Sequence, residues 1–264
     1  MRKDKPLVSI IIPNYNHADY LEERITSILN QTYRNYEIII LDDKSTDNSL
    51  EIINKYKDNS QISNIVINEK NSGSPFKQWF KGMSLAKGEL IWIAECDDSC
   101  ELSMLERLVD TYIKYNCIYA FSFFLVIDSK GEKQYISQRH FKTDIHLNGD
   151  EFIRKFLCIS NTVRNASSAI FSKKAALSID KDFMTYNESG DWMFWMEMAR
   201  LGNVAVISSP LNFFRQYPET NTSRASKKGL TDIEDKRIFD YMIANKLISN
   251  NKIFIKQKRM AKKL

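Results

Sequence analysis

A regular alternation of buried-strand and helix patterns over the first hundred residues constrains this chain more than any other feature. Runs such as LVSIII and YEIIIL are almost entirely apolar, which is typical of strands buried on both faces of a parallel sheet. Strands are expected at Leu7–Ile12, Tyr36–Leu41, Ile62–Ile67 and Glu89–Ala94, and helices from Ala18 or Asp19, at Ser49–Tyr56 and at Phe76–Ala86. The alternation predicts an α/β fold, with a mostly parallel sheet flanked by helices.

The pattern loosens after residue 100, where strands and helices no longer alternate one to one. Helices are expected at Leu102–Tyr115, Gly149–Ile159, Lys173–Ser178 and Asp191–Leu201, and strands at Ala120–Ile127, Ser168–Phe171 and Val204–Ile207. Residues 132–148 look irregular and polar, and residues 231–264 are predicted to form one or two amphipathic helices. We therefore divide the chain into a domain over 1–225, with halves 1–100 and 101–225, and a basic helical extension over 226–264.

Three polar loops directly follow predicted strands. They are Asn14–His17, Asp42–Asn48 and Glu95–Ser99. Ligands of open α/β sheets bind in a crevice at the carboxyl ends of the strands. These loops are therefore expected to meet in one crevice.

The loop after the fourth strand carries three carboxylates, Glu95, Asp97 and Asp98. Carboxylates crowded together repel one another unless a cation neutralises them, and their hard oxygens suit Mg²⁺ or Mn²⁺. A solvated acidic turn is the alternative. Asp42 and Asp43 add two acids at a neighbouring strand end, where Asx turns are the competing role.

The sequence lacks the glycine-rich loops that usually hold phosphates. No GxGxxG follows the first strand, and no GxxxxGK[ST] occurs in the chain. A phosphate ligand would therefore be held through a metal ion and through Lys77 or Arg215. Tyr15, in the first crevice loop, could stack on a base, and a partly buried loop aromatic is the alternative.

Asp191 begins a helix, DWMFWMEMARL, that is apolar on nearly every side. An aspartate at this position is often a helix N-cap. Presented into the crevice, it could instead act as a general base. Met193, Trp195, Met196 and Met198 of the same helix are expected to be core residues.

Positive charge is concentrated near the end of the chain. Residues 225–264 contain 11 Lys or Arg and 4 Asp or Glu, whereas residues 1–224 carry a net charge of −2. The body has no basic stripe, so nucleic-acid binding is not expected. The tail either packs on the body or contacts anionic lipids, with Ile253, Phe254 and Ile255 inserting beside its lysines.

No part of the sequence predicts a membrane span or a secretion signal. The longest apolar run, Ile118–Ile127, is far shorter than the roughly 20 residues needed to cross a bilayer. The four cysteines form no CxxC pair and are expected to be reduced thiols. We therefore expect a cytoplasmic protein that contacts the inner face of the membrane peripherally if its tail binds lipid.

Four segments in this order resemble a known family. VSIIIPNYNHADYLEERITSILNQTYRNYEIIILDDKSTDNS resembles the opening of family 2 glycosyltransferases, which have the Rossmann-like GT-A fold, and AKGELIWIAECDD is similar to their metal-binding DxD region. SGDWMFWMEMARLG and FFRQYPETNTS look like their ED region and their YRxH…S segment. The resemblance spans residues 7–225.

The resemblance implies transfer of a sugar, with inversion, from a nucleotide diphosphate donor to an acceptor hydroxyl. A UDP- or dTDP-sugar donor, a glycan or lipid-linked acceptor, and a role in bacterial surface polysaccharide synthesis would fit. Asp191 is the expected general base, and Asp98 with Asp97 the expected ligands of Mn²⁺ or Mg²⁺. The expected substrate-binding residues are Pro13, Tyr15, Asp42, Asp43, Lys77, Asp97 and Arg215.

The arginine that commonly follows the third strand in the family is absent, and the segment NSGSPFKQW offers only Lys77 there. The sequence also departs from the family pattern at two motif positions. Gly190 stands where the ED pair has its glutamate, with Glu188 close by, and Tyr217 stands where YRxH has its histidine. These departures motivate a second hypothesis, a non-catalytic relative that binds sugar nucleotides or glycans. A nucleotidyltransferase is the third hypothesis, because it also uses a crevice lined with acids.

Overall fold

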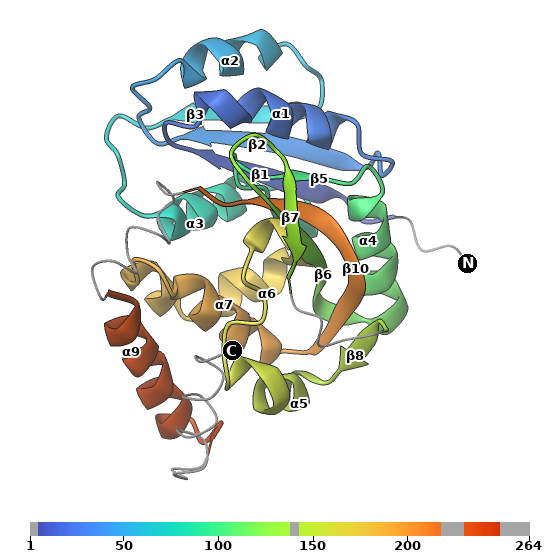
Figure 1. Ribbon diagram of the computed structural model, residues 1–264, viewed down its shortest axis with the longest axis vertical. Coiled ribbons are helices and arrows are strands. Elements are labelled where there is room, and N and C mark those ends of the chain that lie inside the picture. The colour runs from blue at the N-terminus through green and yellow to red at the C-terminus, as the bar shows by residue number, and fades with distance from the viewer. Residues whose placement is uncertain (1–4, 138–142, 218–229, 249–264) are drawn as a thin grey trace.

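The computed structural model describes residues 5–137, 143–217 and 230–248, and these residues are built around one ten-stranded sheet. The strands lie in the order β3-β2-β1-β4-β9-β6-β10-β5, with β7 paired to β6 and β8 to β10 (Figure 1). The strands are β1 (Val8–Asn14), β2 (Tyr36–Asp42), β3 (Ile62–Ile67), β4 (Leu90–Ile93), β5 (Ser99–Cys100), β6 (Cys117–Ile127), β7 (Lys133–Ile136), β8 (Ile145–Leu147), β9 (Ala169–Ser172) and β10 (Asn203–Arg215). The α-helices are α1 (Ala18–Leu29), α2 (Ser49–Tyr56), α3 (Pro75–Leu85), α4 (Met104–Tyr115), α5 (Gly149–Phe152), α6 (Lys173–Ser178), α7 (Gly190–Ala199) and α9 (Leu230–Ala244).

The sheet is mostly parallel, as the alternation predicts. β1 pairs in parallel with β2 and β4, β2 pairs in parallel with β3, and β6 pairs in parallel with β10. β9 runs antiparallel to both of its neighbours, β4 and β6. Because β9 runs backwards, the segment that precedes it lies at the edge where the parallel strands end.

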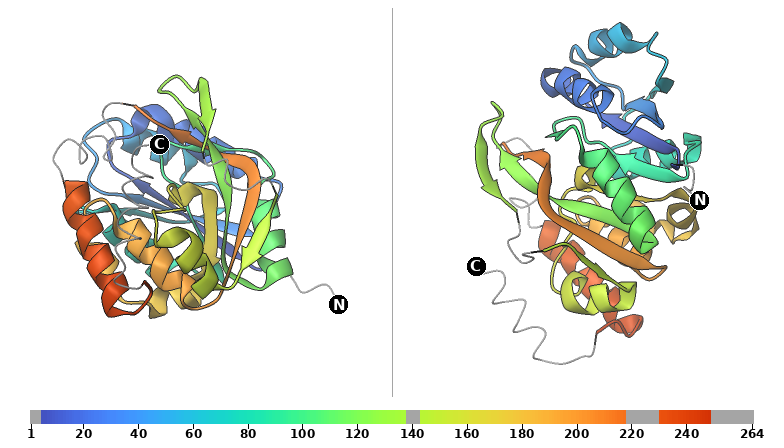
Figure 2. Two further views of the ribbon diagram at one scale, coloured as in Figure 1. Left: turned by 60° about the horizontal axis from the view of Figure 1, so that its bottom comes forward. Right: turned by 90° about the vertical axis from the view of Figure 1, so that its right-hand side faces the viewer.

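Alternation along the buried strands divides the core between the two faces of the sheet. Ile11 of β1 packs in a cluster with residues of α3, α6 and α7, whereas Ile10 and Ile12 pack with residues of α1 and α4. α1 and α2 lie at one end of the molecule, and α5 and α9 at the other (Figure 2). Both faces of the central strands are therefore covered, and the strand ends remain as the place for a site.

Several strands run further than the sequence predicts, among them β1, β6 and β10. β1 continues through Pro13 to Asn14. Its pairing with β4 stops at Ile11, and its last residues pair with β2 alone. β10 runs from Asn203 to Arg215, whereas the sequence predicts only Val204–Ile207. Irregularities in the pairing with β6 on both sides of Pro210 absorb the proline that suggests a loop.

The prediction of an irregular segment over 132–148 is wrong, because this segment contains β7 and β8. All four side chains of β7 are exposed, so no apolar alternation marks it, and its pairing with β6 makes it a strand. The helix predicted at Gly149–Ile159 is a short α5 followed by a π-helix, Ile153–Leu157.

The C-terminal helix α9 packs on the body of the molecule. Ile238 and Met242 of α9 are fully buried in the cluster that contains α7. The predicted boundary at residue 225 and the predicted lipid contact of Ile253, Phe254 and Ile255 lie outside the described residues. Across 5–137, 143–217 and 230–248, no helix has both the length and the apolar composition for a membrane span.

Candidate active site

The loops after β1 and β2 are tied together by side chains. Asn14 Nδ2 donates to Asp42 Oδ2 (2.7 Å) and to Ser45 Oγ (3.1 Å), and Asp42 Oδ1 accepts from the Ser45 amide (2.8 Å). Pro13, just before Asn14, accepts from the Cys96 thiol through its carbonyl (2.9 Å). Tyr15 stays 46% exposed beside these buried groups, so its ring is available to a ligand.

Asp43 organises the loop between β3 and α3. Its buried carboxylate accepts from Asn68 Nδ2 (2.6 Å), from the Ser72 amide and hydroxyl (2.9 and 2.7 Å, respectively), and from Gln78 Nε2 (2.9 Å). Lys77 lies in the first turn of α3, exposed, with Nζ 3.4 Å from the Ser72 carbonyl oxygen. Asp43 therefore shapes the loop that leads into α3, and the side chain of Lys77 in the first turn of α3 remains accessible.

The acidic loop after β4 is held by hydrogen bonds to other segments. Glu95 Oε1 accepts from Trp79 Nε1 (2.9 Å), and Asp98 Oδ2 accepts from Asn165 Nδ2 (2.8 Å). Burial, together with the charge of Asp97, raises the pKa of Glu95 to about 8 and that of Asp98 to about 6. Ionisation of these acids is thus unfavourable without a partner, and a bound cation would favour their ionised forms.

Arg215 and Tyr217, at the end of β10, fix Asp97. Arg215 is buried, and its guanidinium donates to the Asp97 carbonyl (2.8 Å) and pairs with Glu23 (2.7 Å). The Arg215 amide donates to Asp98 Oδ1 (3.1 Å), and the Tyr217 hydroxyl donates to Asp97 Oδ2 (3.2 Å). Arg215 is engaged with protein groups in this conformation, which favours an indirect role in which it orders the acidic loop.

A buried cation, Arg24, lies on α1 close enough to act on this loop. The side chain of Arg24 is fully buried, and its guanidinium lies 5.0 Å from the centre of the Trp92 ring. None of its three nitrogens has a hydrogen-bond partner among the described residues. Its charge opposes the rise in the pKa of Asp98 and of Glu95, which burial and Asp97 cause.

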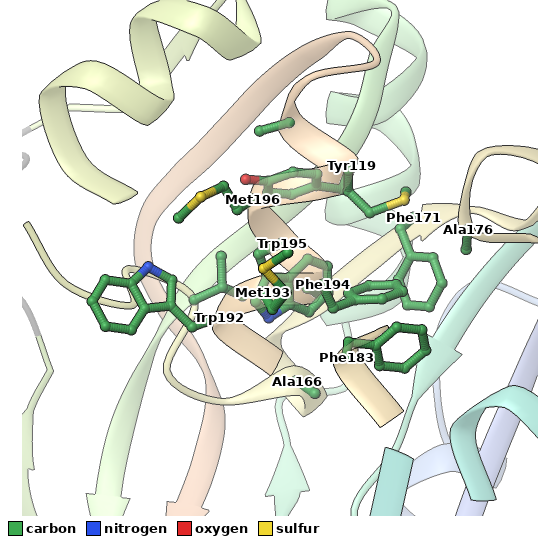
Figure 3. Close-up of a cluster of buried hydrophobic side chains, with 14 of the residues drawn as sticks. Tyr119, Ala166, Phe171, Ala176, Phe183, Trp192, Met193, Phe194, Trp195 and Met196 are labelled. Atoms are coloured by element: carbon green, nitrogen blue, oxygen red, sulfur yellow. The ribbon is translucent and has the colours of Figure 1, made fainter. Parts of the chain in front are cut away.

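Asp191 lies in the first turn of α7, on a helix whose other residues are packed on all sides. Trp192, Met193, Phe194, Trp195 and Met196 are buried and point away from the helix in several directions (Figure 3). Asp191 is half-buried, and its carboxylate accepts from Asn161 Nδ2 (2.6 Å) and from the Trp192 amide (2.8 Å). Loss of water raises the pKa of Asp191 to about 7, against the effect of these two hydrogen bonds.

One short segment connects Asp191 with the acidic loop. Asn161 donates to Asp191, and Asn165, four residues later, donates to Asp98. Four residues span at most about 14 Å, so the two aspartates lie on the same side of the molecule. Asp97, Asp98 and Asp191 are therefore gathered at one edge of the sheet, together with Asp42 and Asp43 at the neighbouring strand ends.

Comparison with known proteins shows the family of this chain. The family model described as glycosyl transferase family 2 matches residues 9–178, more than half of the chain. The chain belongs to glycosyl transferase family 2. The match covers the loops after β1, β2 and β4 but stops before α7, so the assignment of Asp191 depends on its own geometry.

Curated relatives of this family member come from bacteria. The putative teichuronic acid biosynthesis glycosyltransferase TuaG of Bacillus subtilis is 32% identical over 127 residues, which is 48% of this chain and 50% of TuaG. The poly(ribitol-phosphate) beta-glucosyltransferase of Bacillus spizizenii is 44% identical over 95 residues, which is 34% of this chain and 15% of that protein. The chain thus spans half the length of TuaG and a smaller part of the second relative.

Solved structures share the fold of this family 2 member. The crystal structure of S. aureus TarS 1–349 in complex with UDP-GlcNAc superposes with a TM-score of 0.66 at 21% identity, over 82% of this chain and 60% of that one. The similarity confirms the predicted GT-A architecture, a mostly parallel sheet flanked by helices.

Both departures from the family motifs have a structural basis. A Cβ added at Gly190 would lie 2.4 Å from the Phe183 carbonyl oxygen and 2.6 Å from the Phe76 ring, so no glutamate fits there without a shift of backbone. Tyr217, in the place of the histidine, reaches Asp97 through its hydroxyl and lies 3.3 Å from His17 Nδ1. Position 217 therefore still contacts the acidic loop.

Several residues of the site could hardly be recognised as functional from the sequence. Asn161 and Asn165 precede β9, and the sequence does not show that β9 runs antiparallel and so brings them to this edge. Trp79, which donates to Glu95, is expected from the sequence only as part of a helix. Arg24 follows Leu21 by three residues on the buried face of α1, and that spacing is the one available signal.

The donors at the acidic loop fit a hard divalent cation in kind. Asp97 and Asp98 offer carboxylates at consecutive positions, and Asp97 Oδ1 has no hydrogen-bond partner among the described residues. Both oxygens of Asp98 already accept from protein donors, each with further lone-pair capacity. Within the described part of the chain, no group of three or more His, Cys, Asp or Glu forms a metal site. Phosphate oxygens of a ligand would have to complete the coordination.

Proposed function

We propose that this chain transfers a sugar from a nucleotide diphosphate donor to an acceptor hydroxyl with inversion, in the synthesis of a bacterial surface glycan. The observation that carries the proposal is that one short segment of a family 2 chain holds both groups of acids. Its Asn161 donates to Asp191, and its Asn165 donates to Asp98, the neighbour of Asp97. The names of TuaG and of the poly(ribitol-phosphate) beta-glucosyltransferase support a cell-wall or surface polymer as the class of product.

On the donor side, the loops after β1 and β2 would hold the nucleoside. The exposed Tyr15 offers a ring for stacking on the base. Asp42 ties the loop after β2 to Asn14, and Asp43 shapes the loop between β3 and α3. Lys77 is an accessible cation beside the Asp43 loop and would face the diphosphate. A UDP- or dTDP-sugar is the proposed donor class, and the complex of TarS with UDP-GlcNAc supports the first of these.

Mn²⁺ or Mg²⁺ is the proposed cofactor, with Asp98 and Asp97 as its protein ligands. Such an ion, when bound, would offset the charge that develops on the departing diphosphate. Tyr217 would hold Asp97 in place through its carboxylate, and Arg215 would hold it through its main-chain carbonyl.

On the acceptor side, Asp191 is the proposed general base. A pKa near 7 suits a carboxylate that must be ionised at neutral pH and still take a proton from a hydroxyl as that hydroxyl attacks. Asn161 fixes one carboxylate oxygen, and the packed helix α7 fixes the backbone behind it. A single displacement of this kind needs no enzyme nucleophile.

Release of nucleoside diphosphate from a panel of UDP- and dTDP-sugars with Mn²⁺ tests the proposal. Wild type is expected to release the diphosphate from one donor, and Asp191→Asn to be slower by about 10²-fold or more. Asp240→Asn, which removes an exposed charge from α9, is the control and is expected to match wild type. If a donor binds but no nucleoside diphosphate is released with any acceptor, the hypothesis of a non-catalytic relative is favoured. Release of pyrophosphate would favour a nucleotidyltransferase.

The metal requirement has its own test. Chelation with EDTA is expected to abolish release, and Mn²⁺ or Mg²⁺ to restore it. Asp98→Asn is expected to remove the gain in melting temperature that Mn²⁺ gives in the presence of UDP, because ligand binding stabilises the native state. Full activity in EDTA would rule out the metal.

A further inference from the structure

Helix α9 is part of the structure that supports α7. Ile238 and Met242 are fully buried in the cluster around α7, and the Phe239 ring packs edge-on against Trp192, with centroids 5.9 Å apart. α9 lies beside α7 in the ribbon view (Figure 1). The helix that follows the glycosyltransferase motifs therefore contacts the element that carries the proposed base.

A buried carboxylate on α9, that of Glu234, holds the turn that leads into α7. Glu234 Oε1 accepts from the Asn187 amide (2.6 Å), and Oε2 accepts from the amides of Glu188 (2.9 Å) and Ser189 (2.8 Å). Glu234 is only 4% exposed. Three consecutive amides before Gly190 are thus satisfied by one side chain from another part of the chain.

Within the described residues, α7 has no side-chain cap of its own. Ser189, at the N-cap position of α7, makes no side-chain capping bond, and Gly190 has no side chain. The preceding residues are tied to α9 as well, since Arg237 lies 4.0 Å from the centre of the Tyr186 ring and donates to Thr185 Oγ1 (2.9 Å). The position of the first turn of α7 therefore depends on α9.

We propose that Glu234 is a positioning residue for Asp191, holding the turn Asn187–Ser189 from which α7 presents the Asp191 carboxylate. The inference rests on the proposed function, in which Asp191 is the general base. Glu234 would act in two ways: its hydrogen bonds fix where Asp191 points, and its negative charge acts on the Asp191 carboxylate.

The charged groups around Asp191 give the direction of the second effect. Two acids interact electrostatically with Asp191, Glu188 from the turn before α7 and Glu234 from α9, and the neutral Asn161 donates a hydrogen bond to it. Asp235 Oδ1 accepts from Ser189 Oγ (3.5 Å), so α9 brings a second acid to this turn, and Arg237 of α9 contacts Tyr186 just before it. Three backbone amides outweigh burial and keep the pKa of Glu234 below its ordinary value, so Glu234 is ionised at neutral pH. Its charge contributes to the raised pKa of Asp191.

The first experiment needs no substrate. Carboxyl ¹³C titration of the full chain, with the Asp191 signal assigned by its loss in Asp191→Asn, measures the Asp191 midpoint in wild type, in Glu234→Gln and in the control Asp240→Asn. Glu234→Gln is expected to lower the midpoint by about 0.3 unit or more, and Asp240→Asn to leave it unchanged. An unchanged midpoint in Glu234→Gln overturns the proposal.

The second experiment uses whichever donor wild type cleaves. Glu234→Gln is expected to lower kcat about tenfold while KM for the donor stays within about twofold, because the base and not the donor site is displaced. A rise in KM for the donor as large as the fall in kcat overturns a positioning role. Absence of release from any donor by wild type defeats the proposed function, whereas the titration still decides whether Glu234 acts on Asp191.

A second variant keeps the test decisive if Glu234→Gln does not fold. Glu234→Asp keeps the charge but is shorter by one methylene, so it cannot reach all three amides. Hydrogen exchange at the amides of residues 187–189 is expected to be faster than in wild type, and the Asp191 midpoint to stay raised. Unchanged exchange overturns the proposal.

Discussion

Replacing Asp191 by asparagine is expected to stabilise the protein, and to do so only above acidic pH. The folded protein raises the pKa of Asp191 from 3.8 to about 7, so folding favours its protonated form. Below pH 4 the carboxyl is neutral in both the folded and the unfolded state, and its stabilising effect is fully present. As the pH rises from 3.8 towards 7 the unfolded chain ionises while the folded protein keeps its proton, so stability is lost. Above pH 7 the folded protein also holds the charge, and the loss is complete.

The structure sets the size of this effect. A shift of about 3 pKa units corresponds to about 4 kcal/mol at most. Asp191 is half-buried, and an asparagine can satisfy only one of its two donors, Asn161 and the Trp192 amide, through its single carbonyl oxygen. We therefore expect a gain of about 2 kcal/mol at pH 8, which is about 4–8 °C in Tm for a chain of this size.

Thermal unfolding of wild type and Asp191→Asn at intervals from pH 4.5 to pH 8.5 measures the effect. The difference in Tm is expected to be smallest at the acid end, to grow as the pH rises towards 7 and to level off above pH 7. Asp240→Asn, an exposed charge on α9, is the control and is expected to give a flat difference. A difference for Asp191→Asn that is flat across the range, or that shrinks as the pH rises, would refute the reasoning.

Two further substitutions follow from contacts around Asp191, and one deletion tests the basic tail. Asn161→Ala removes a donor to the ionised carboxylate of Asp191, so the acid limb of the pH–rate profile is expected to move up by about 0.5–1 unit; a downward shift would contradict this. Gly190→Ala places a Cβ 2.4 Å from the Phe183 carbonyl oxygen, so a loss of about 2 kcal/mol or more is expected in chemical denaturation, and a neutral change would show that the backbone yields freely. Deleting residues 246–264 removes most of the basic tail, so co-sedimentation with anionic vesicles at low salt is expected to weaken; equal binding would exclude the tail as a lipid contact.

Most of the first hundred residues could be predicted from local pattern. α2 and β3 have the predicted bounds, and β1, β2, α3 and β4 differ by one or two residues at their ends. Strands buried on both faces must be almost wholly apolar, and helices that cover them must be apolar every three or four residues, so the pattern is strong there. Errors fall where pairing, and not composition, makes the strand, as in the exposed β7.

The candidate site also contains residues that the sequence identifies and residues that it does not. The acids of the loops after β2 and β4 could be named from sequence, because parallel strands joined by helices bring their carboxyl ends to one edge. Asn165, which holds Asp98, and Glu234, which holds the turn before Asp191, could not be named. Nothing in the residues around Asn165 or Glu234 indicates what either side chain contacts, because those partners are 67 and 47 residues away.

The sequence by itself determined the layers of this protein and the side of the sheet on which its chemistry lies, because both follow from periodicity and from the handed, short connections of an α/β chain. The tertiary structure alone decided how the acids are held: the reversed direction of β9, which brings Asn165 to Asp98, and the docking of α9, which brings Glu234 to the turn before the base. Such contacts depend on how distant segments pack against each other, and a local pattern does not record that packing.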